Sequence, residues 1–177
     1  MKHFYICLLP LAAVLALMGS PVAESDHDHG HNDHADHRAM MGGAPGEAAK
    51  AKRTVELIAL DTEFKPKTIR VAAGETVRFV IRNKGELLHE FTIGGKEMHA
   101  VHQQEMERLM LQGVITTIGI DRAKLGSAGH SHGNSVLVEP GKSVELVWKF
   151  AKAADIEFAC NIPGHYQSGM RGAIEIQ

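Results

Sequence analysis

The sequence predicts an all-β fold, an antiparallel β-sandwich that carries one helical insertion. Short segments in which apolar and polar residues alternate recur from Thr54 to the C-terminus, as expected for strands with one buried face. Turn-forming clusters separate them, notably Asn83 to Gly85 and Glu139 to Lys142. Short alternating strands with frequent turns are typical of a two-sheet sandwich, and residues 54–177 are long enough for one such core.

The strand pattern is clearest where the domain begins. Val55, Leu57 and Ala59 alternate with Glu56 and Ile58, so alternate side chains are expected to face the same side of a sheet. The segments with strand character are 55–59, 68–71, 76–81, 90–93, 135–138, 143–150, 156–160 and 173–176. Together they supply the strands of two packed sheets.

One stretch departs from this pattern. Residues 96–112 contain neither Gly nor Pro and are rich in Met, Glu, Gln and Leu, which predicts a helix. The helix belongs to an insertion at about 96–133, between the strand that ends near Ile93 and the strand that begins near Ser135. A connection of this length inside a sandwich indicates a functional role rather than a passive link.

The chain begins with the layout of a secretory signal peptide, residues 1–23. Lys2 and His3 precede an apolar run from Ile6 to Met18, and small residues lead to a cleavage position near Ala23. The run is too short for a comfortable membrane span, although an uncleaved anchor is the alternative. We therefore predict export to the periplasm, with no stable membrane insertion after cleavage.

Residues 24–53 are predicted to be a disordered tail, because they hold too little apolar surface to offset the entropy of ordering. Aspartates alternate with the histidines of this tail, which are His27, His29, His31, His34 and His37. The run is either a solvated charged segment or a flexible, low-specificity site for Cu(II), Zn(II) or Ni(II).

Composition narrows the possible functions. Lys and Arg number 19 against 21 Asp and Glu, and no basic stripe alternates with aromatic residues, which argues against a nucleic-acid partner. Cleavage of the signal peptide would remove Cys7 and leave Cys160 as the single cysteine. A lone cysteine in an exported protein cannot form an internal disulfide, so Cys160 is either a buried thiol or a metal thiolate.

The strongest functional signal is the segment from Cys160 to Met170, in which His165 lies midway. A thiolate, an imidazole and a thioether in one short loop suit copper, and two histidines, a cysteine and a weak axial methionine make the type 1 electron-transfer site. The segment holds one histidine, so a second must come from elsewhere, and His89 is the best candidate. Zinc is the main competitor, but structural zinc sites rarely recruit methionine.

This combination, Asn83 and His89 followed by Cys160-x4-His165-x4-Met170, resembles the cupredoxin family of type 1 copper proteins. The loop is most similar to the rusticyanin and auracyanin members, and the histidine-rich tail resembles periplasmic copper-resistance cupredoxins. The resemblance implies a cupredoxin-like Greek-key β-sandwich, one bound copper ion and one-electron transfer. Its ligands would be His89, Cys160, His165 and Met170.

Two positions depart from the pattern of the family. Many members have Asn or Asp after the first ligand histidine and Ser or Thr after the cysteine, and these residues tie the two ligand segments together. Here the positions hold Glu90 and Asn161. Because residues around the ligands tune the metal, the reduction potential and a blue or green colour do not transfer from the family.

The insertion contains further possible ligands. Met98, His102, Met106 and Met110 recur every four residues, so a helix aligns them on one face. The stripe is either packed core or a second, Cu(I)-preferring site formed by Met98, His102 and Met106 with His99. His130 and His132 form either a weak copper clamp or a polar loop.

Three functions are compatible with these features. The first is electron transfer by a periplasmic cupredoxin in copper homeostasis or resistance, with a redox protein or a copper-handling protein as partner. The second is a copper sink or carrier without an electron-shuttle role, which the tail and the insertion favour. The third is a cuprous oxidase, which would need a second open copper position, so an enzyme is not the leading expectation.

Overall fold

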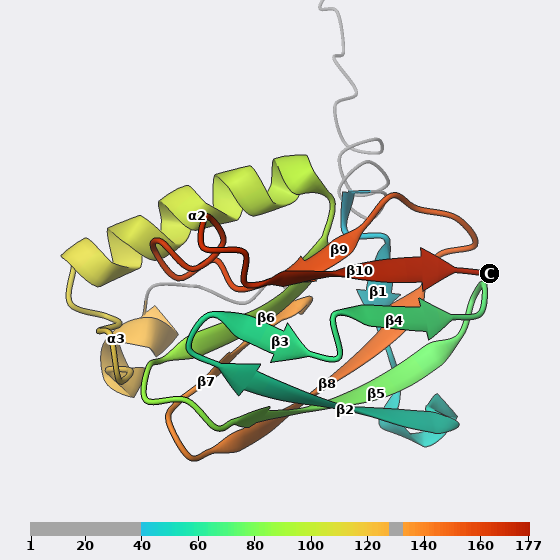
Figure 1. The fold of residues 1–177 in the computed structure, drawn as a ribbon, viewed down its shortest axis with the longest axis horizontal. Coiled ribbons are helices and arrows are strands. Elements are labelled where there is room, and N and C mark those ends of the chain that lie inside the picture. The colour runs from blue at the N-terminus through green and yellow to red at the C-terminus, as the bar shows by residue number, and fades with distance from the viewer. Residues whose placement is uncertain (1–39, 128–132) are drawn as a thin grey trace, which may run out of the picture.

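Two five-stranded sheets pack face to face in the computed structural model, which describes residues 40–127 and 133–177 (Figure 1). The predicted signal peptide, the tail histidines and both His130 and His132 lie outside the described residues. The first sheet has the order β1 (Gly43–Pro45), β8 (Ser143–Phe150), β5 (Thr76–Asn83), β2 (Arg53–Leu60) and β3 (Glu63–Lys65). The second has the order β4 (Thr68–Val71), β10 (Arg171–Ile176), β9 (Glu157–Ala159), β6 (His89–Gly94) and β7 (Ser135–Val138).

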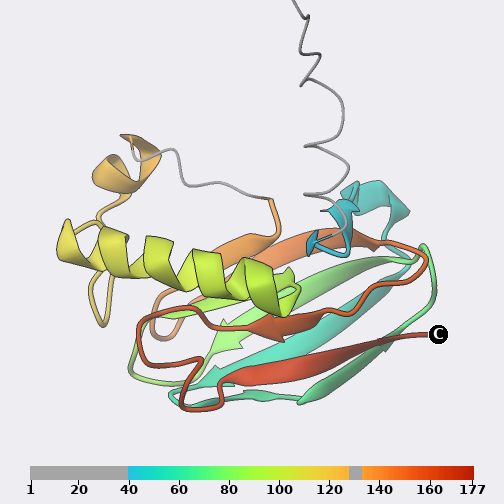
Figure 2. The same cartoon turned by 90° about the horizontal axis from the view of Figure 1, so that it is seen from above.

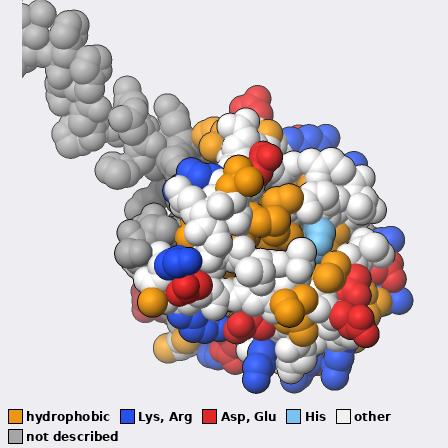
Figure 3. Space-filling model, turned by 90° about the vertical axis from the view of Figure 1, so that its left-hand side faces the viewer, with side chains coloured by type: hydrophobic (Ala, Val, Ile, Leu, Met, Phe, Trp, Pro, Cys, Tyr) orange, Lys and Arg blue, Asp and Glu red, His pale blue; other side chains and the backbone are white. Residues whose placement is uncertain are grey.

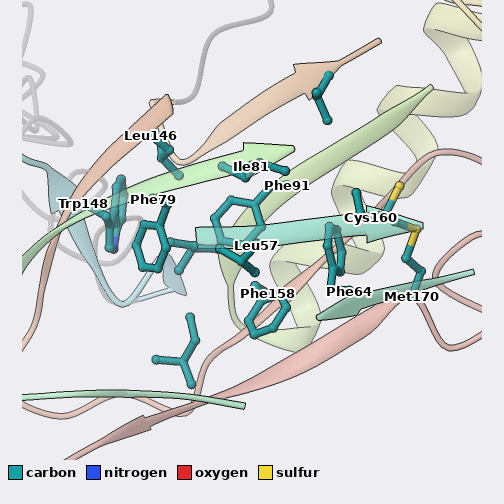
Figure 4. Packing of buried hydrophobic residues seen from close by; sticks show 14 of the residues in the cluster. Leu57, Phe64, Phe79, Ile81, Phe91, Leu146, Trp148, Phe158, Cys160 and Met170 are labelled. Carbon is teal, nitrogen blue, oxygen red and sulfur yellow. The ribbon is translucent and has the colours of Figure 1, made fainter. Parts of the chain in front are cut away.

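Alternation builds the core as predicted. In β5, Val77, Phe79 and Ile81 are fully buried while the residues between them are partly exposed. Aromatic rings from both sheets meet between the layers: Phe79 and Phe91 have centroids 5.4 Å apart, and Phe91 and Phe158 5.5 Å apart (Figure 4). Large side chains of this kind dominate the apolar area that a small sandwich buries. The predicted all-β sandwich is confirmed.

Two strand pairs are parallel, which corrects the prediction of a purely antiparallel sandwich. β2 pairs with β5, and β4 pairs with β10, in parallel. The chain passes through β4 in the opposite sheet between β2 and β5, so it returns to the first sheet in its original direction. Such crossings between layers belong to the Greek-key arrangement and leave no mark in the local alternation of a strand.

The folded part begins earlier than residue 54. Gly43–Pro45 form strand β1 on the edge of the first sheet, paired with β8, and Ala48–Lys50 form the 3-10 helix η1. A Cβ on Gly43 would come within 2.3 Å of the Lys149 carbonyl oxygen, so this close pairing requires glycine. The prediction of a disordered tail is therefore wrong for Gly43–Pro45 and Ala48–Lys50. Pairing with a distant strand orders this segment, although its composition predicts no regular structure.

The predicted helix is α2 (Lys96–Leu111), followed in the insertion by the short α3 (Arg122–Ser127). In both views α2 lies beside the loop that joins β9 to β10 (Figure 1, Figure 2). Met106 and Leu109 of α2 are fully buried in the hydrophobic core. Within residues 40–127 and 133–177, no helix has both the length and the apolar character needed to cross a bilayer.

Strand β6 is buried along its whole length, unlike the other strands. Phe91 and Ile93 point into the core, so the alternating residues Glu90 and Thr92 point to the outer face of the sheet. Helix α2 covers that face, because His102 lies 2.8 Å from the Glu90 carboxylate. The insertion thus converts an outer sheet surface into a buried polar layer.

Asn83 fixes the turn that leads into β6. Its side chain is 1% exposed, and its Nδ2 donates to the carbonyl oxygens of Leu87 (2.7 Å) and Val138 (3.0 Å). Its Oδ1 accepts from the backbone N–H of Gly85 at 2.9 Å. These bonds connect the end of β5 to β7 and determine where His89 begins the next strand.

We expect Asn83→Ala to lower the free energy of unfolding by about 2 kcal/mol, because it leaves buried backbone groups without partners. Denaturant titration monitored by tryptophan fluorescence would measure this. Lys84→Ala, at an exposed neighbouring position, is the control and should change stability by less than about 0.5 kcal/mol. Equal midpoints for the two variants would contradict the role assigned to Asn83.

Candidate metal centre

Three predicted ligands meet at one end of the sandwich. His89 is the first residue of β6, Cys160 follows β9, and His165 lies in the loop between β9 and β10. One donor atom from each lies within 4.8 Å of the others. The distance from Cys160 Sγ to His165 Nδ1 is 3.4 Å, and the two imidazole centroids are 5.2 Å apart. Among the described residues, this is the one group of three or more His, Cys, Asp or Glu side chains close enough to hold a metal ion.

Met170 lies next to this group. It is fully buried and directly precedes β10, and Figure 4 shows its side chain beside that of Cys160 at one end of the core. The loop brings these residues together through backbone hydrogen bonds. Cys160 N–H donates to the Met170 carbonyl oxygen at 3.0 Å, and Met170 N–H donates to the His165 carbonyl oxygen at 3.0 Å. The loop is thus folded back on itself, with its sulfur atoms on the inside.

Two glycines make this loop geometry possible. Gly164 and Gly169 have φ angles of 87° and 89°, in the left-handed region that favours glycine. Each lies directly beside a predicted ligand, His165 or Met170. The sequence interpretation of the Pro-Gly-His step as a sharp, stiff turn agrees with this backbone.

The two histidines are prepared as neutral ligands. Burial and, to a smaller extent, the proximity of His165 lower the pKa of His89 to about 4, and Asp61 only partly opposes them. Burial also lowers the pKa of His165. Asp61 Oδ1 lies 3.4 Å from His89 Nε2, so a proton on Nε2 faces a carboxylate. Both ring nitrogens of His89 are buried without a hydrogen-bond partner, and the lone pair of Nδ1, which does not face Asp61, is available for a metal.

Cys160 is a buried thiol that a cation must deprotonate. Burial raises its pKa to about 12, and the nearby Glu90 carboxylate contributes. Two backbone N–H groups, of Glu90 (3.3 Å) and Ile162, point to the sulfur and favour the thiolate. A bound metal ion provides the positive charge that displaces the proton, so metal binding is coupled to proton release.

The donor set fits copper. A soft thiolate, two neutral imidazoles and an adjacent thioether suit copper in both oxidation states, and the unpartnered Nδ1 of His89 is explained by a ligand role. His165 is half-buried, whereas the other described histidines are buried. Figure 3 shows a histidine side chain at a surface hollow among hydrophobic side chains. The centre therefore lies just below the surface.

The two departures from the family pattern form a direct connection across the site. Asn161 Nδ2 donates to Glu90 Oε2 at 3.0 Å, and both residues are fully buried. The segment of His89 and the segment of Cys160 are therefore tied together, as in the family, but by a carboxylate and an amide. Asn161 Oδ1 also lies 3.2 Å from His99 Nδ1 on α2. The inserted helix α2 thus supplies a partner, His99, to one of the two residues that differ from the family pattern.

Glu90 remains charged in this buried position. Burial opposes its ionisation, but the positive charge of His102 and hydrogen bonds from His102, Ser135 and Asn161 outweigh burial and lower the pKa to about 2. Conversely, burial opposes the positive charge of His102, yet Glu90 and Glu105 raise the pKa of its imidazole. Glu90 and His102 are therefore a buried ion pair that joins α2 to β6.

The predicted accessory ligands lie in different surroundings. Met106 is packed in the core, and His99 faces Asn161 and the ring of Tyr166, whose centroid is 5.9 Å away. Both ring nitrogens of His102 face carboxylates, of Glu90 (2.8 Å) and Glu105 (3.1 Å). Met98 and His102 both line one cavity, whereas His99 and Met106 do not line it. The structure does not bring Met98, His99, His102 and Met106 together around one point, and a copper site formed by these four stays a prediction.

Sequence reasoning did not include Asp61, Ser135 or the pairing of α2 histidines with Glu90 and Asn161. Asp61 lies 28 positions before His89, and no local spacing connects the two. The sequence did contain one signal, which is Glu90 at the position where many family members have Asn or Asp. A carboxylate beside a predicted ligand and inside a buried strand needs a cationic partner, and the insertion offers histidines.

A model of a family described as copper binding proteins, the plastocyanin/azurin family, matches residues 51–177. This match, the two-sheet fold and the clustered histidine and cysteine donors establish the class of protein. The chain belongs to the plastocyanin/azurin family, and copper is the metal for which its site is suited. The predicted resemblance to cupredoxins is confirmed.

Relatives place the chain more closely. It is 50% identical over 148 residues to the copper-resistant cuproprotein CopI of Pseudomonas aeruginosa, covering 76% of this chain and 82% of that protein. It is 39% identical over 174 residues to the copper-resistant cuproprotein CopI of Rubrivivax gelatinosus, covering 96% and 94% of the two chains. Among solved structures, auracyanin B is similar with a TM-score of 0.57 at 18% identity, over 77% of this chain and 96% of that one. This last likeness shows the fold.

We expect Asn161→Ala to weaken Cu(II) binding by about 10- to 100-fold, because it removes the connection between the two ligand segments. Competition with a chelator of known affinity would measure this. Gln104→Ala, at an exposed position on α2, is the control and should bind copper as the unaltered protein does. Unchanged affinity in Asn161→Ala would show that the hydrogen bond to Glu90 does not organise the site.

Proposed function

We propose that His89, Cys160, His165 and Met170 bind one type 1 copper ion, and that the protein transfers single electrons in periplasmic copper homeostasis. The observation that carries this proposal is the convergence of the His89, Cys160 and His165 donor atoms within 4.8 Å. Family membership supports copper as the metal, and the buried thioether of Met170 beside Cys160 supports the type 1 class.

In this function, the polypeptide holds the copper ligands in fixed positions. His89 belongs to a strand, and the remaining ligands lie on a loop closed by backbone hydrogen bonds, so little rearrangement is needed when the charge of the centre changes. Bound copper supplies a one-electron couple between Cu(II) and Cu(I). Burial of Cys160 and Met170 keeps water from these sulfur atoms.

Electron exchange requires one ligand near the surface. His165 is half-buried while Cys160 and Met170 are buried, so its imidazole is the predicted path to a redox partner. Helix α2 supports this loop from one side: Gln167 Nε2 donates to Gln103 Oε1 at 2.7 Å, and His99 lies beside Tyr166. The insertion therefore braces the loop that carries the predicted electron path.

The physiological role rests on the relatives and the predicted signal peptide. Two relatives that cover most of the chain are named copper-resistant cuproproteins. A second candidate function, a copper sink or carrier, is favoured by the methionine side chains that line a cavity beside α2. An electron shuttle has no need of that cavity.

A host bacterium that lacks its own copper-tolerance cupredoxin would test the role. The wild-type chain should restore growth at elevated copper and be found in the periplasmic fraction, while Cys160→Ala should not restore growth. Voltammetry of the purified protein should give a reversible couple. Restored growth by Cys160→Ala would contradict a role for the type 1 centre, and copper release to an acceptor without a reversible couple would favour the carrier.

A further inference from the structure

A cavity of about 290 Å³ lies beside α2, apart from the residues of the predicted type 1 centre. Three methionines line it: Met40 and Met41, which precede β1, and Met98, in the first half of α2. The remaining lining residues are Val101, His102, Glu105 and Asn134. Thioethers from segments more than 50 positions apart in the sequence therefore share one cavity.

The methionines are held in place by the backbone. Gly95 N–H donates to the Met40 carbonyl oxygen at 2.8 Å, which connects the Met40–Met41 segment to the residue that precedes α2. Ala151 N–H donates to the Gly42 carbonyl oxygen at 2.9 Å and connects the same segment to the end of β8. These hydrogen bonds fix the backbone positions from which the three methionine side chains extend to the cavity.

Asn134 supplies an independent observation. Its side chain is 1% exposed and lines the cavity. Its Nδ2 donates to the Ile93 carbonyl oxygen at 2.7 Å and lies 3.9 Å from Met98 Sδ, while its buried Oδ1 has no hydrogen-bond partner. The Nδ2 contact thus holds the Met98 thioether at the wall of the cavity, while the buried Oδ1 is not accessible from it.

We propose that this cavity is a second metal site, which binds Cu(I) through the thioethers of Met40, Met41 and Met98. Soft neutral thioethers select Cu(I) over hard or divalent ions. Thioethers also need no deprotonation, so the site binds without releasing a proton. Methionines that only fill space would close the gap, whereas these leave a cavity, and Met40 is 41% exposed and accessible to ions in solution.

The residues of this site differ from those that the four-residue repeat aligns on one face of the helix. Met106 is in the core and Met110 packs partly against it, so neither lines the cavity. Met98 is retained, and the two new ligands come from the segment before β1. The site does not depend on Cys160, so a result that contradicts one of the two proposed copper sites leaves the other untouched.

The test is a titration of the folded full chain, labelled with ¹³C at the methionine methyl groups, with Ag(I) as a redox-inert substitute for Cu(I). The methyl signals of Met40, Met41 and Met98 should shift together, and those of Met106 and Met110 should not. The triple variant Met40→Leu/Met41→Leu/Met98→Leu keeps side-chain volume. Under anaerobic conditions it should bind one Cu(I) fewer per chain and keep the visible spectrum of the Cu(II)-loaded protein.

Met110→Leu is the matched control and should retain the full Cu(I) stoichiometry. Unshifted methyl signals for Met40, Met41 and Met98 in the unaltered protein would overturn the proposal, whether or not the triple variant folds. A triple variant with undiminished Cu(I) stoichiometry would also overturn it. The type 1 proposal is read separately, from the visible spectrum and the methyl signal of Met170.

Discussion

Cys160→Ala is expected to abolish the intense visible absorption of the Cu(II)-loaded protein. That absorption comes from charge transfer between a thiolate and copper, and Cys160 is the one cysteine among the described residues. His89 and His165 remain in the variant, so weaker binding of Cu(II) through nitrogen can persist without this band. The measurement is the optical spectrum and copper content after loading and removal of excess metal.

Ser168→Ala provides the control for this prediction. Ser168 lies in the same loop, is exposed, and donates through Oγ to the Gly164 carbonyl oxygen at 2.8 Å, but offers no donor to the metal group. Its spectrum should match that of the wild type. An intense charge-transfer band in Cys160→Ala, or its loss in Ser168→Ala, would contradict the assignment of the thiolate.

Local spacing predicted the part of the site that is local in the chain. Cys160, His165 and Met170 lie in one loop between neighbouring strands, so their proximity follows from sequence distance and turn chemistry. His89 is different, because its position depends on the pairing of β6 with β9 in a sheet. Its selection over His99 and His102 needed strand position and family resemblance, and the structure places it within 4.8 Å of the others.

The same reasoning explains what sequence could not predict. The pairing of β1 with β8, and the parallel pairs, depend on contacts between distant segments that no local pattern encodes. The absence of Gly and Pro from residues 96–112 correctly predicted a helix, and its four-residue repeat aligned Met98, His102, Met106 and Met110 on one face. It did not identify the partner of that face, because a histidine that binds metal and one that pairs with a buried carboxylate have the same spacing.

Removal of the Glu90 carboxylate is expected to cause the largest loss of stability. Glu90→Ala leaves His102 buried without the carboxylate 2.8 Å away, and leaves Ser135 Oγ and Asn161 Nδ2 without their acceptor. Breaking a buried ion pair by removing one partner costs about 3–5 kcal/mol. Denaturant unfolding of the metal-free protein would measure this loss.

Two variants isolate the contribution of the buried charge. Glu90→Gln keeps the shape and an acceptor oxygen, so it should lose less stability than Glu90→Ala. Glu56→Ala breaks an exposed ion pair with Arg82 (3.2 Å) and should cost less than about 1 kcal/mol. If Glu90→Ala and Glu56→Ala lose equal stability, the buried ion pair stabilises the protein no more than the exposed pair does.

The stability difference between wild type and Glu90→Ala should also depend on pH in a defined way. The pKa of Glu90 is lowered to about 2 from 4.5, so its contribution is fully present above pH 4.5 and is lost as the pH falls towards 2. The pKa of His102 is raised above 6.5, so its contribution is fully present below pH 6.5 and is lost as the pH rises through the folded-state value. The difference should therefore be largest between pH 4.5 and 6.5 and decrease on both sides. Because His89 and His165 titrate in both proteins, their effects cancel in this comparison, and a difference that does not change with pH would contradict the ion pair.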